Sequence, residues 1–278
     1  MERSGPEISK SDLQRIADAR SSLENPGWMI KAVNSIGIPI ESLGKRVPTF
    51  MQTKIQVAIE KTLQGIIKAN LLTIQKGKVF SKPKNSFYKG VVGVSGAASG
   101  FLGSTTGIGT AAFITELGLS TQLMMRSIMD IARSHGEDLY DHKTQLACME
   151  VFALGGTSKD DDGAETSYYA TRYALTAALG QINKTTLNKT LGLAMGYANT
   201  IGIEALSRFV AMIAGRFSTV ASEKFIAQSI PILGAAGGSG LNVLFIHHFQ
   251  KMGDAHFTLR NMERKYGEEA VKAAYYKS

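Results

Sequence analysis

Histidines near the C-terminal end are the residues best suited to bind a metal. His247 and His248 are adjacent, and Asp254 and His256 follow them. On one helix, metal ligands must lie three or four residues apart. His248, Met252 and His256 have that spacing, but methionine is a poor zinc ligand, and two turns, roughly 10 Å, separate His247 from Asp254. We therefore expect no metal site and no cofactor.

The nucleophile candidates are equally limited. Cys148 stands among Leu146, Ala147 and Met149, a setting typical of a buried structural thiol. As the single cysteine of the chain it excludes an intramolecular disulfide, which favours a reducing compartment such as the cytoplasm. No GxSxG elbow is present, so catalytic residues stay unassigned and enzyme activity stays open.

Charged residues inside apolar helical segments form a further group. Glu116 ends a long uncharged run, Arg126 and Asp130 are four residues apart, and Glu204 and Arg208 repeat that spacing. Pairs with this spacing meet on one helix face and are usually solvated or structural. If they line a cavity between the glycine-rich segments described below, they can bind a lipid headgroup.

The excess of positive charge lies in the first third of the chain. The net charge is +8, and residues 1–90 hold 15 Lys/Arg against 7 Asp/Glu, whereas the remainder holds 16 of each. This asymmetry predicts an anionic partner, either lipid or nucleic acid. Nucleic acid is disfavoured because no recognisable nucleic-acid motif accompanies the charge.

Lysines and aromatic residues alternate just before the glycine-rich segment, in KGKVFSKPKNSFYK. Lysines are attracted to an anionic leaflet, and aromatic rings suit the headgroup layer. A solvated linker is the alternative. The membrane-binding candidates are Lys76, Lys78, Phe80, Lys82, Lys84, Phe87, Tyr88 and Lys89.

Residues 49–75 have the pattern of a basic amphipathic helix. One side carries Ile55, Ile59, Leu63 and Ile66, and nearly the opposite side carries Lys54, Lys61 and Lys68. Such a helix either docks on a protein core or lies on a membrane.

Two glycine-rich segments, at 90–118 and 231–246, need a physical reason for their composition. The 26 residues between Lys89 and Glu116 carry no charge. Glycines four apart let two helix backbones approach closely, although each costs about 1 kcal/mol in a helix. The alternatives are insertion into a bilayer and a phosphate-binding loop, for which GxxxxGK[ST] and a preceding strand are absent. The candidate contact glycines are Gly96, Gly100, Gly103, Gly107, Gly234 and Gly238.

The elements that position these residues are predicted to be helical. Helices are expected at 11–24 with a cap at Ser9 or Ser11, at 26–35, 49–75, 117–133, 144–156, 164–180 and 185–228, and in a last segment ending near Tyr266–Gly267. Period-two alternation is missing, which predicts an all-α, multi-helix bundle. We expect a basic helical region with its lysine-rich arm at 1–89 and a helical domain at 90–278. GAASG followed by HGED, and GAAGG followed by YGEE, suggest a degenerate internal repeat.

Three blocks of the sequence carry a family resemblance. They are STQLMMRSIMDIARSHGEDLYDHKTQLACMEVFALGG at 120–156, DDDGAETSYYATRYAL at 160–175 and SEKFIAQSIPILGAAGGSGLNVLFIHHFQKMGDAHFTLRNMERKYG at 222–267. With these blocks the chain resembles the EcsC family of bacterial proteins, over roughly residues 90–270. The family's link to an ABC transporter and to protein secretion implies a connection with membranes, and the resemblance implies no reaction.

These patterns predict a cytoplasmic protein, peripherally associated with a membrane, that binds or handles lipid or assists a transport or secretion machine. Its partners would be anionic lipid or a hydrophobic ligand, and a membrane transporter. The N-terminus lacks the apolar segment of a secretory signal. The alternatives are a soluble enzyme, such as a hydrolase, with a site in the helical core, and a protein that inserts its glycine-rich segments into a bilayer.

Overall fold

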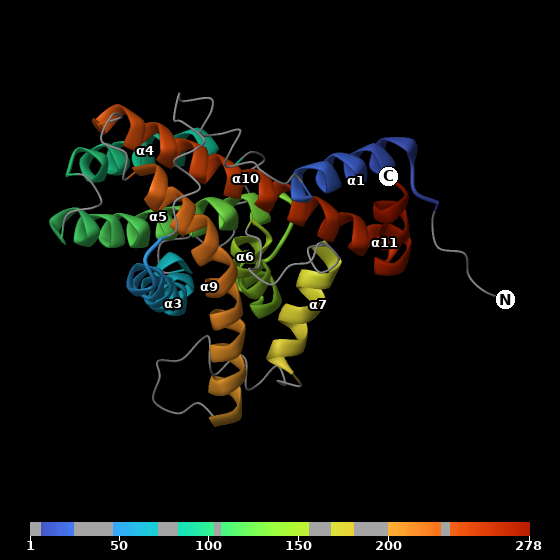
Figure 1. Cartoon of the computed structure of the whole chain (residues 1–278). Helices are drawn as coiled ribbons and strands as arrows, with labels where there is room; N and C mark the ends of the chain where they lie inside the picture. Colours follow the sequence, from blue (N-terminus) through green and yellow to red (C-terminus); the bar gives the residue numbers. More distant parts are fainter. Residues whose placement is uncertain are drawn as a thin grey trace.

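A computed structural model describes residues 7–24, 47–71, 83–102, 107–155, 168–180, 200–228 and 234–278. Each regular element within these ranges is an α-helix, which confirms the predicted all-α bundle (Figure 1). The helices are α1 (Lys10–Leu23), α3 (Thr49–Leu71), α4 (Asn85–Leu102), α5 (Gly107–Ser134), α6 (His142–Leu154), α7 (Tyr168–Leu179), α9 (Thr200–Gln228), α10 (Gly234–Tyr266) and α11 (Glu268–Lys277).

Several helix ends follow directly from local sequence. The Ser9 hydroxyl accepts a hydrogen bond from the Asp12 backbone N–H at 3.2 Å and caps α1. Gly136 after α5 and Gly267 after α10 have φ values of +82° and +88°, which side chains disfavour and glycine tolerates. The predicted ends at these glycines are confirmed. The sequence reading missed α11, which starts at Glu268 directly after the Gly267 turn.

The glycine-rich segments are helical where the structure describes them. α5 begins at Gly107, well before the expected Leu117, and Gly96 and Gly100 lie within α4. Gly234 and Gly238 lie in the first two turns of α10, whereas Gly103 falls outside the described residues. No helix in the described part of the chain is both long and apolar enough to cross a membrane.

The long helix α10 organises the molecule (Figure 1). α4 packs beside its first half, α1 packs beside its second half, and α11 folds back against its end. α5 packs on α4 and α10, and α3 packs on α5 and α9. Helices from the first third of the chain therefore contact helices from the last third.

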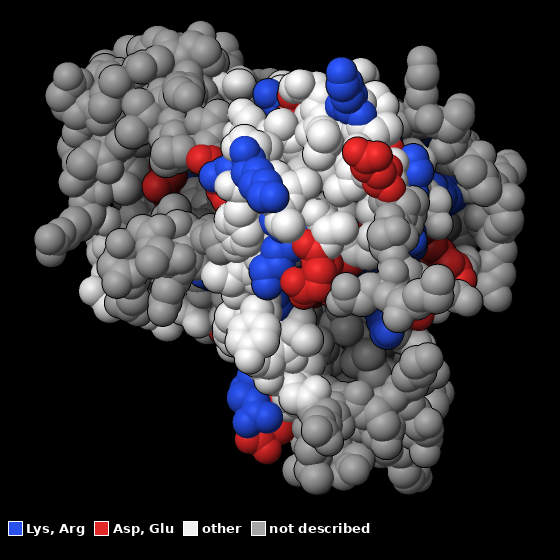
Figure 2. Space-filling view, turned by 90° about the vertical axis from the view of Figure 1, so that its right-hand side faces the viewer, with Lys and Arg blue, Asp and Glu red and all other residues white. Residues whose placement is uncertain are grey.

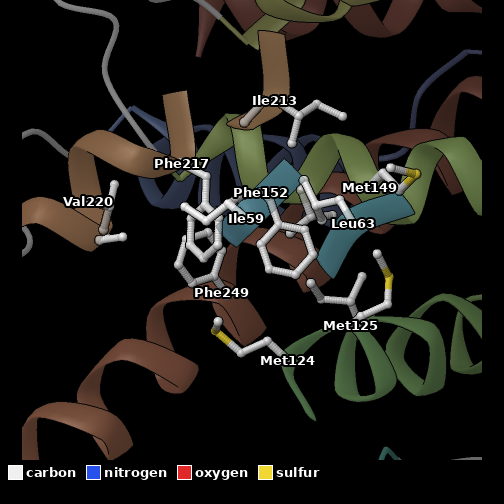
Figure 3. Close-up of a cluster of buried hydrophobic side chains, with 14 of the residues drawn as sticks. Ile59, Leu63, Met124, Met125, Met149, Phe152, Ile213, Phe217, Val220 and Phe249 are labelled. Carbon is white, nitrogen blue, oxygen red and sulfur yellow. The ribbon is translucent and has the colours of Figure 1, made fainter. Parts of the chain in front are cut away.

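A large apolar core fills the space between these helices. Figure 3 shows side chains from α3, α5, α6, α9 and α10 converging there. The predicted stripe of α3 is part of this core: Ile55, Ile59, Leu63 and Ile66 are 0–3% exposed. Docking on a protein core is thus confirmed for this face of α3, and the same face cannot lie on a membrane.

A second, smaller core joins the two ends of the described chain. It contains Ile16 of α1, Tyr168 of α7, Leu259 of α10, and Val271 and Tyr275 of α11. Tyrosine rings dominate it, with Tyr169 and Tyr275 in edge-to-face contact at 5.2 Å between centroids. This core holds α1, α7 and α11 on the C-terminal half of α10.

The approach of α4 to α10 is close at Gly93. A Cβ atom on Gly93 would lie 3.2 Å from Val243 Cγ2 and 3.3 Å from Ser239 Oγ, closer than ordinary van der Waals contact. Gly93 precedes Gly96 by three residues and Gly100 by seven, spacings that repeat on one helix face. Gly93, which was not among the predicted contact glycines, thus lies at a close approach of α4 and α10. The surroundings of Gly96, Gly100, Gly103, Gly107, Gly234 and Gly238 fall outside what the structure describes, so close packing at these glycines stays a prediction.

Candidate functional site

The described end of the lysine-rich run forms the entry to α4. Phe87 is 62% exposed and Val91, one turn later, is 40% exposed; Lys84 is exposed as well. Lys76, Lys78, Phe80 and Lys82 lie outside the described residues. Of the predicted membrane-binding residues, Lys84 and Phe87 therefore have the exposure that such a role requires.

Tyr88 does not have that exposure. Its ring is buried, and its hydroxyl donates a hydrogen bond to Asp130 Oδ2 at 2.7 Å. Burial, together with the Asp130 carboxylate, raises the pKa of Tyr88 to about 12. This correction follows from helix geometry, because Tyr88 lies on the side of α4 that faces α5, whereas Phe87 lies on the outer side.

Asp130 takes part in this same contact rather than facing an open cavity. Besides Tyr88 it binds Arg133, whose Nη2 atom is 2.9 Å from Asp130 Oδ1. The hydrogen bond and the charge of Arg126 lower the pKa of Tyr88, whereas burial and Asp130 raise it. These groups fix the first turns of α4 on α5.

Glu204 and Arg208 also differ from the cavity hypothesis. They pair at 3.3 Å between Oε1 and Nη1, as the four-residue spacing predicts. However, their side chains are 67% and 59% exposed on the outside of α9. They form a surface ion pair of small energetic weight.

Glu116, by contrast, is the centre of a buried polar cluster. Its carboxylate accepts hydrogen bonds from Lys224 Nζ at 2.9 and 3.1 Å, from Asn242 Nδ2 at 2.8 Å and from the Ser120 hydroxyl at 2.5 Å. Burial alone would raise the pKa of Glu116, but Lys224 and the hydrogen bonds lower it below its usual value. Asn242 Nδ2 also donates to the Val92 carbonyl at 2.9 Å, so α4, α5, α9 and α10 meet here.

A second buried polar cluster joins α6, α7 and α10. The Tyr168 hydroxyl lies 3.0 Å from His256 Nδ1 and accepts a hydrogen bond from Arg172 at 3.2 Å. Arg172 also binds Glu263 at 2.6 Å. Glu150 Oε2 lies 3.8 Å from His256 Nε2, too far for a hydrogen bond. Burial raises the pKa of Glu150 to about 7 and holds that of His256 well below its usual value.

The remaining chemically suited residues have structural positions. His248 Nε2 lies 3.1 Å from the Gly155 carbonyl, and burial lowers the pKa of His248 to about 3. Cys148 is fully buried, and burial raises the pKa of its thiol, as expected for a structural cysteine. Among the described residues, no three His, Cys, Asp or Glu side chains are grouped to hold a metal ion.

An open groove of about 520 Å³ lies where α1, the first turn of α4, the end of α5 and the middle of α10 meet. Its wall includes the charged or titratable side chains of Arg15, Asp18, Lys89, His135, His247, Lys251 and Asp254. The groove therefore combines predicted candidates, Lys89, His247 and Asp254, with residues that the sequence reading did not select.

Within the groove, basic groups gather around His247. Lys89 Nζ lies 3.0 Å from His247 Nδ1, and Lys251 follows His247 by one helical turn. Since an ammonium group can only donate, Nδ1 accepts this hydrogen bond, and the neutral ring carries its proton on Nε2. Burial lowers the pKa of His247, and the charges of Lys89 and Lys251 lower it further.

The acidic residues of the groove are bonded to other partners. Asp254 Oδ1 is 2.9 Å from His135 Nε2, and Asp18 Oδ1 accepts a hydrogen bond from Gln14 at 2.8 Å. Within the described ranges, neither Lys89 nor Lys251 forms an ion pair with a carboxylate. The lining thus holds three cationic side chains, Arg15, Lys89 and Lys251, against the two carboxylates of Asp18 and Asp254, an excess of one positive charge.

Comparison with protein families gives one match. The EcsC protein family matches residues 10–262, which is nearly the whole chain. The chain belongs to the EcsC family. Comparison with curated proteins and with solved structures finds no match.

The EcsC match extends further toward the N-terminus than the resemblance in the sequence suggested. It starts at residue 10 rather than near residue 90, so it includes α1 and α3. It also includes the groove lining and the Glu116 cluster, and all of the second buried polar cluster except Glu263. α11 lies beyond the matched residues.

The sequence reading of this EcsC protein missed two central polar residues, Lys224 and Asn242. A signal for Lys224 was present, because it follows Phe217, Val220 and Ala221 at seven, four and three residues and thus shares their buried face. A lysine on an apolar helix face requires a buried counter-charge. Asn242 has no such local signal, since its partners are set by the packing of α10 on α4 and α5.

Proposed function

We propose that this EcsC protein associates peripherally with an anionic membrane surface on the cytoplasmic side, where it binds lipid or assists a membrane machine. The observation that carries the proposal is an exposed basic and apolar face on α4, formed by Lys84, Phe87 and Val91. A buried core explains apolar residues that face inward, but it does not explain a phenylalanine ring that is 62% exposed.

α3 carries the same combination on its outer face. Phe50 is 63% exposed and Val57 is 42% exposed, and the exposed Lys54 lies 5.6 Å from the centre of the Phe50 ring. Residues 50, 54, 57 and 61 recur at helical spacing, so Lys61 continues the stripe. In Figure 1 both helices lie in the half of the molecule away from α11, with the first turn of α4 meeting α1. Aromatic rings at headgroup depth flanked by lysines are typical of peripheral membrane binding.

The face formed by α1, α7 and α11 offers a contrast. In Figure 2, the Lys and Arg side chains of its described part lie beside Asp and Glu. Arg20 pairs with Glu24 and Lys265 pairs with Asp12, at 2.9 and 2.8 Å. Neutralised charge of this kind gives little attraction to an anionic leaflet, so the proposal assigns membrane contact to α3 and α4.

Vesicle sedimentation tests this proposal. We expect tighter binding to vesicles that contain phosphatidylglycerol than to pure phosphatidylcholine, and weaker binding as salt rises. Phe87→Ala and Phe50→Ala should each weaken binding about tenfold, because each removes one exposed aromatic ring that membrane contact would bury. The matched control is Tyr173→Ala, which removes an aromatic residue that is 78% exposed on α7.

Equal binding to both vesicle types at all salt concentrations would contradict the electrostatic part of the proposal. An effect of Tyr173→Ala as large as that of Phe87→Ala would contradict the assignment to α3 and α4. The alternative of a soluble enzyme stays a prediction, for which the Glu150–His256 pair supplies the acid and base types that such chemistry needs.

A further inference from the structure

We infer that the groove between α4 and α10 is a binding site for a phosphate-bearing anion, held by Lys89, His247 and Lys251. This inference does not depend on the proposed membrane contact, which concerns the outer faces of α3 and α4. It concerns a small ligand and names the chemistry of that ligand.

Lys89, His247 and Lys251 give the site its hydrogen-bond donors. Lys89 Nζ donates to His247 Nδ1 at 3.0 Å, so the ring presents its remaining nitrogen as an N–H donor. Lys89 keeps two further N–H groups, and Lys251 contributes three. The three side chains therefore present donors only, and a ligand that satisfies them must be an acceptor.

The lysine charges beside His247 favour an anionic ligand. Lys89 Nζ lies 3.0 Å from Nδ1 of the half-buried His247 ring, and Lys251 follows His247 by one helical turn. Burial lowers the pKa of His247, and both lysine charges lower it further. The two groove carboxylates contact groups other than these lysines: Asp254 contacts His135, and Asp18 accepts a hydrogen bond from Gln14. With Arg15, Lys89 and Lys251 against Asp18 and Asp254, the lining keeps an excess of one positive charge. Lys224, which is buried, has the Glu116 carboxylate as its counter-charge. Lys89 is half-buried and Lys251 is exposed, and within the described residues neither pairs with a carboxylate. An anion in the groove would neutralise the two lysines in the same way.

Hydrogen bonds hold the first turn of α4, and with it the backbone of Lys89, in place. The lining of the groove includes Asn85 and Gln250, and Gln250 Nε2 donates to the Asn85 carbonyl at 3.1 Å and to the Ser127 hydroxyl at 2.9 Å. The first turn of α4 is also fixed through Tyr88 and Asp130. Lys89 thus projects from a helix that is held on both sides, and a preformed site loses little entropy on binding.

The size of the groove and the type of donor indicate the ligand class. A phosphate group carries several acceptor oxygens and a charge that suits two lysines. About 520 Å³ exceeds the need of inorganic phosphate and falls in the range of small-molecule sites. We therefore assign the ligand as an organic phosphate, either a lipid headgroup or a soluble phosphate ester.

Isothermal titration with inorganic phosphate and with glycerol 3-phosphate, against chloride at equal ionic strength, tests the site. We expect both phosphates to bind, and Lys251→Ala and Lys89→Ala to weaken each by about tenfold or more. Lys251→Arg should retain most of the affinity. The matched control is Lys143→Ala, which removes an exposed lysine from α6.

Vesicles that contain phosphatidic acid form the second arm and identify the source of the phosphate. Loss of vesicle binding in Lys251→Ala but not in Lys143→Ala indicates a lipid headgroup, whereas loss of glycerol 3-phosphate binding alone indicates a soluble ester. Phe87→Ala should leave glycerol 3-phosphate binding unchanged, which separates this site from the membrane contact. If the folded Lys251→Ala variant binds phosphates and phosphatidic acid as the wild type does, or if the wild type binds neither, the inference is wrong.

Discussion

Glu116 and Glu150 are both buried carboxylates, yet their surroundings shift their pKa values in opposite directions. Glu116 faces the Lys224 ammonium at 2.9 Å and accepts three kinds of hydrogen bond, so its pKa is lowered despite burial. Glu150 lies 3.8 Å from His256, whose ring is neutral. Burial is therefore the dominant effect on Glu150 and raises its pKa to about 7. Arg172 and Arg260 oppose that rise without cancelling it. At the scale of the residue, the partner and not the depth of burial decides the charge.

Glu150→Gln is expected to change how stability depends on pH. The pKa of Glu150 rises from 4.5 to about 7 on folding, so the folded state binds the proton more tightly. The free energy of unfolding should therefore fall as pH rises from about 4.5 to about 7, by about 2–4 kcal/mol from this group, and stay level above. Urea denaturation at pH 5 and pH 8 should show a smaller difference in Glu150→Gln than in the wild type.

Glu116→Gln is the matched control for this prediction. It leaves the buried Lys224 without its counter-charge, which should cost about 3–5 kcal/mol at both pH values. If the free energy of unfolding of Glu150→Gln depends on pH as strongly as that of the wild type, Glu150 is already ionised at pH 5 and the prediction is wrong.

At the scale of the element, glycine acts differently at neighbouring positions of α4. Around Gly93 the atoms of α10 lie so close that a Cβ atom would meet Val243 at 3.2 Å, whereas a Cβ atom on Gly90 would meet nothing within 4 Å. Gly90 thus carries the usual helical cost of glycine without a packing reason. Gly93 is required by the approach of two helices, and Asn242 reinforces that approach through the adjacent Val92 carbonyl.

Opposite effects are expected from substitutions at these two glycines. Gly93→Leu should destabilise the protein by about 1–3 kcal/mol, because the larger side chain separates α4 from α10. Gly90→Ala should stabilise it by about 0.5–1 kcal/mol through helix propensity. Thermal and chemical denaturation of the two variants measures both changes. A neutral Gly93→Leu would mean that α4 can move away from α10 without cost.

At the scale of the whole molecule, the two ends of the described chain close against each other. α11 brings Tyr275 into the second core, where its hydroxyl donates to Glu24 Oε1 at 2.9 Å and Arg20 lies 5.5 Å from the ring centre. The Arg20 guanidinium also binds the backbone oxygens of Tyr275 and Ser278 at 3.0 and 2.6 Å. α1 is thus held by a helix at the other end of the sequence, one that lies beyond the family match.

Tyr275→Ala is expected to loosen both terminal helices. Tyr275 is fully buried, and removal of a buried aromatic side chain typically costs about 3–5 kcal/mol. Amide hydrogen exchange should show lower protection in α1 as well as in α11, and little change in α3. The control is Tyr276→Ala, at a residue that is 50% exposed. Equal loss of stability in the two variants would refute a specific role of Tyr275 in this closure.

The sequence by itself determined the features that depend on one or two helical turns. It predicted the all-α class, a cap at Ser9 or Ser11, the turns at Gly136 and Gly267, the apolar stripe of α3 and the burial of Cys148. These follow from periodicity, capping and backbone freedom, which act within a few residues. Only the tertiary structure decided that Tyr88 is buried while Phe87 is exposed, that Lys224 meets Glu116 across 108 positions, and that Lys89 meets His247 across 158. These pairings depend on which helix faces come together, and that choice is made by the packing of the whole core rather than by any local pattern.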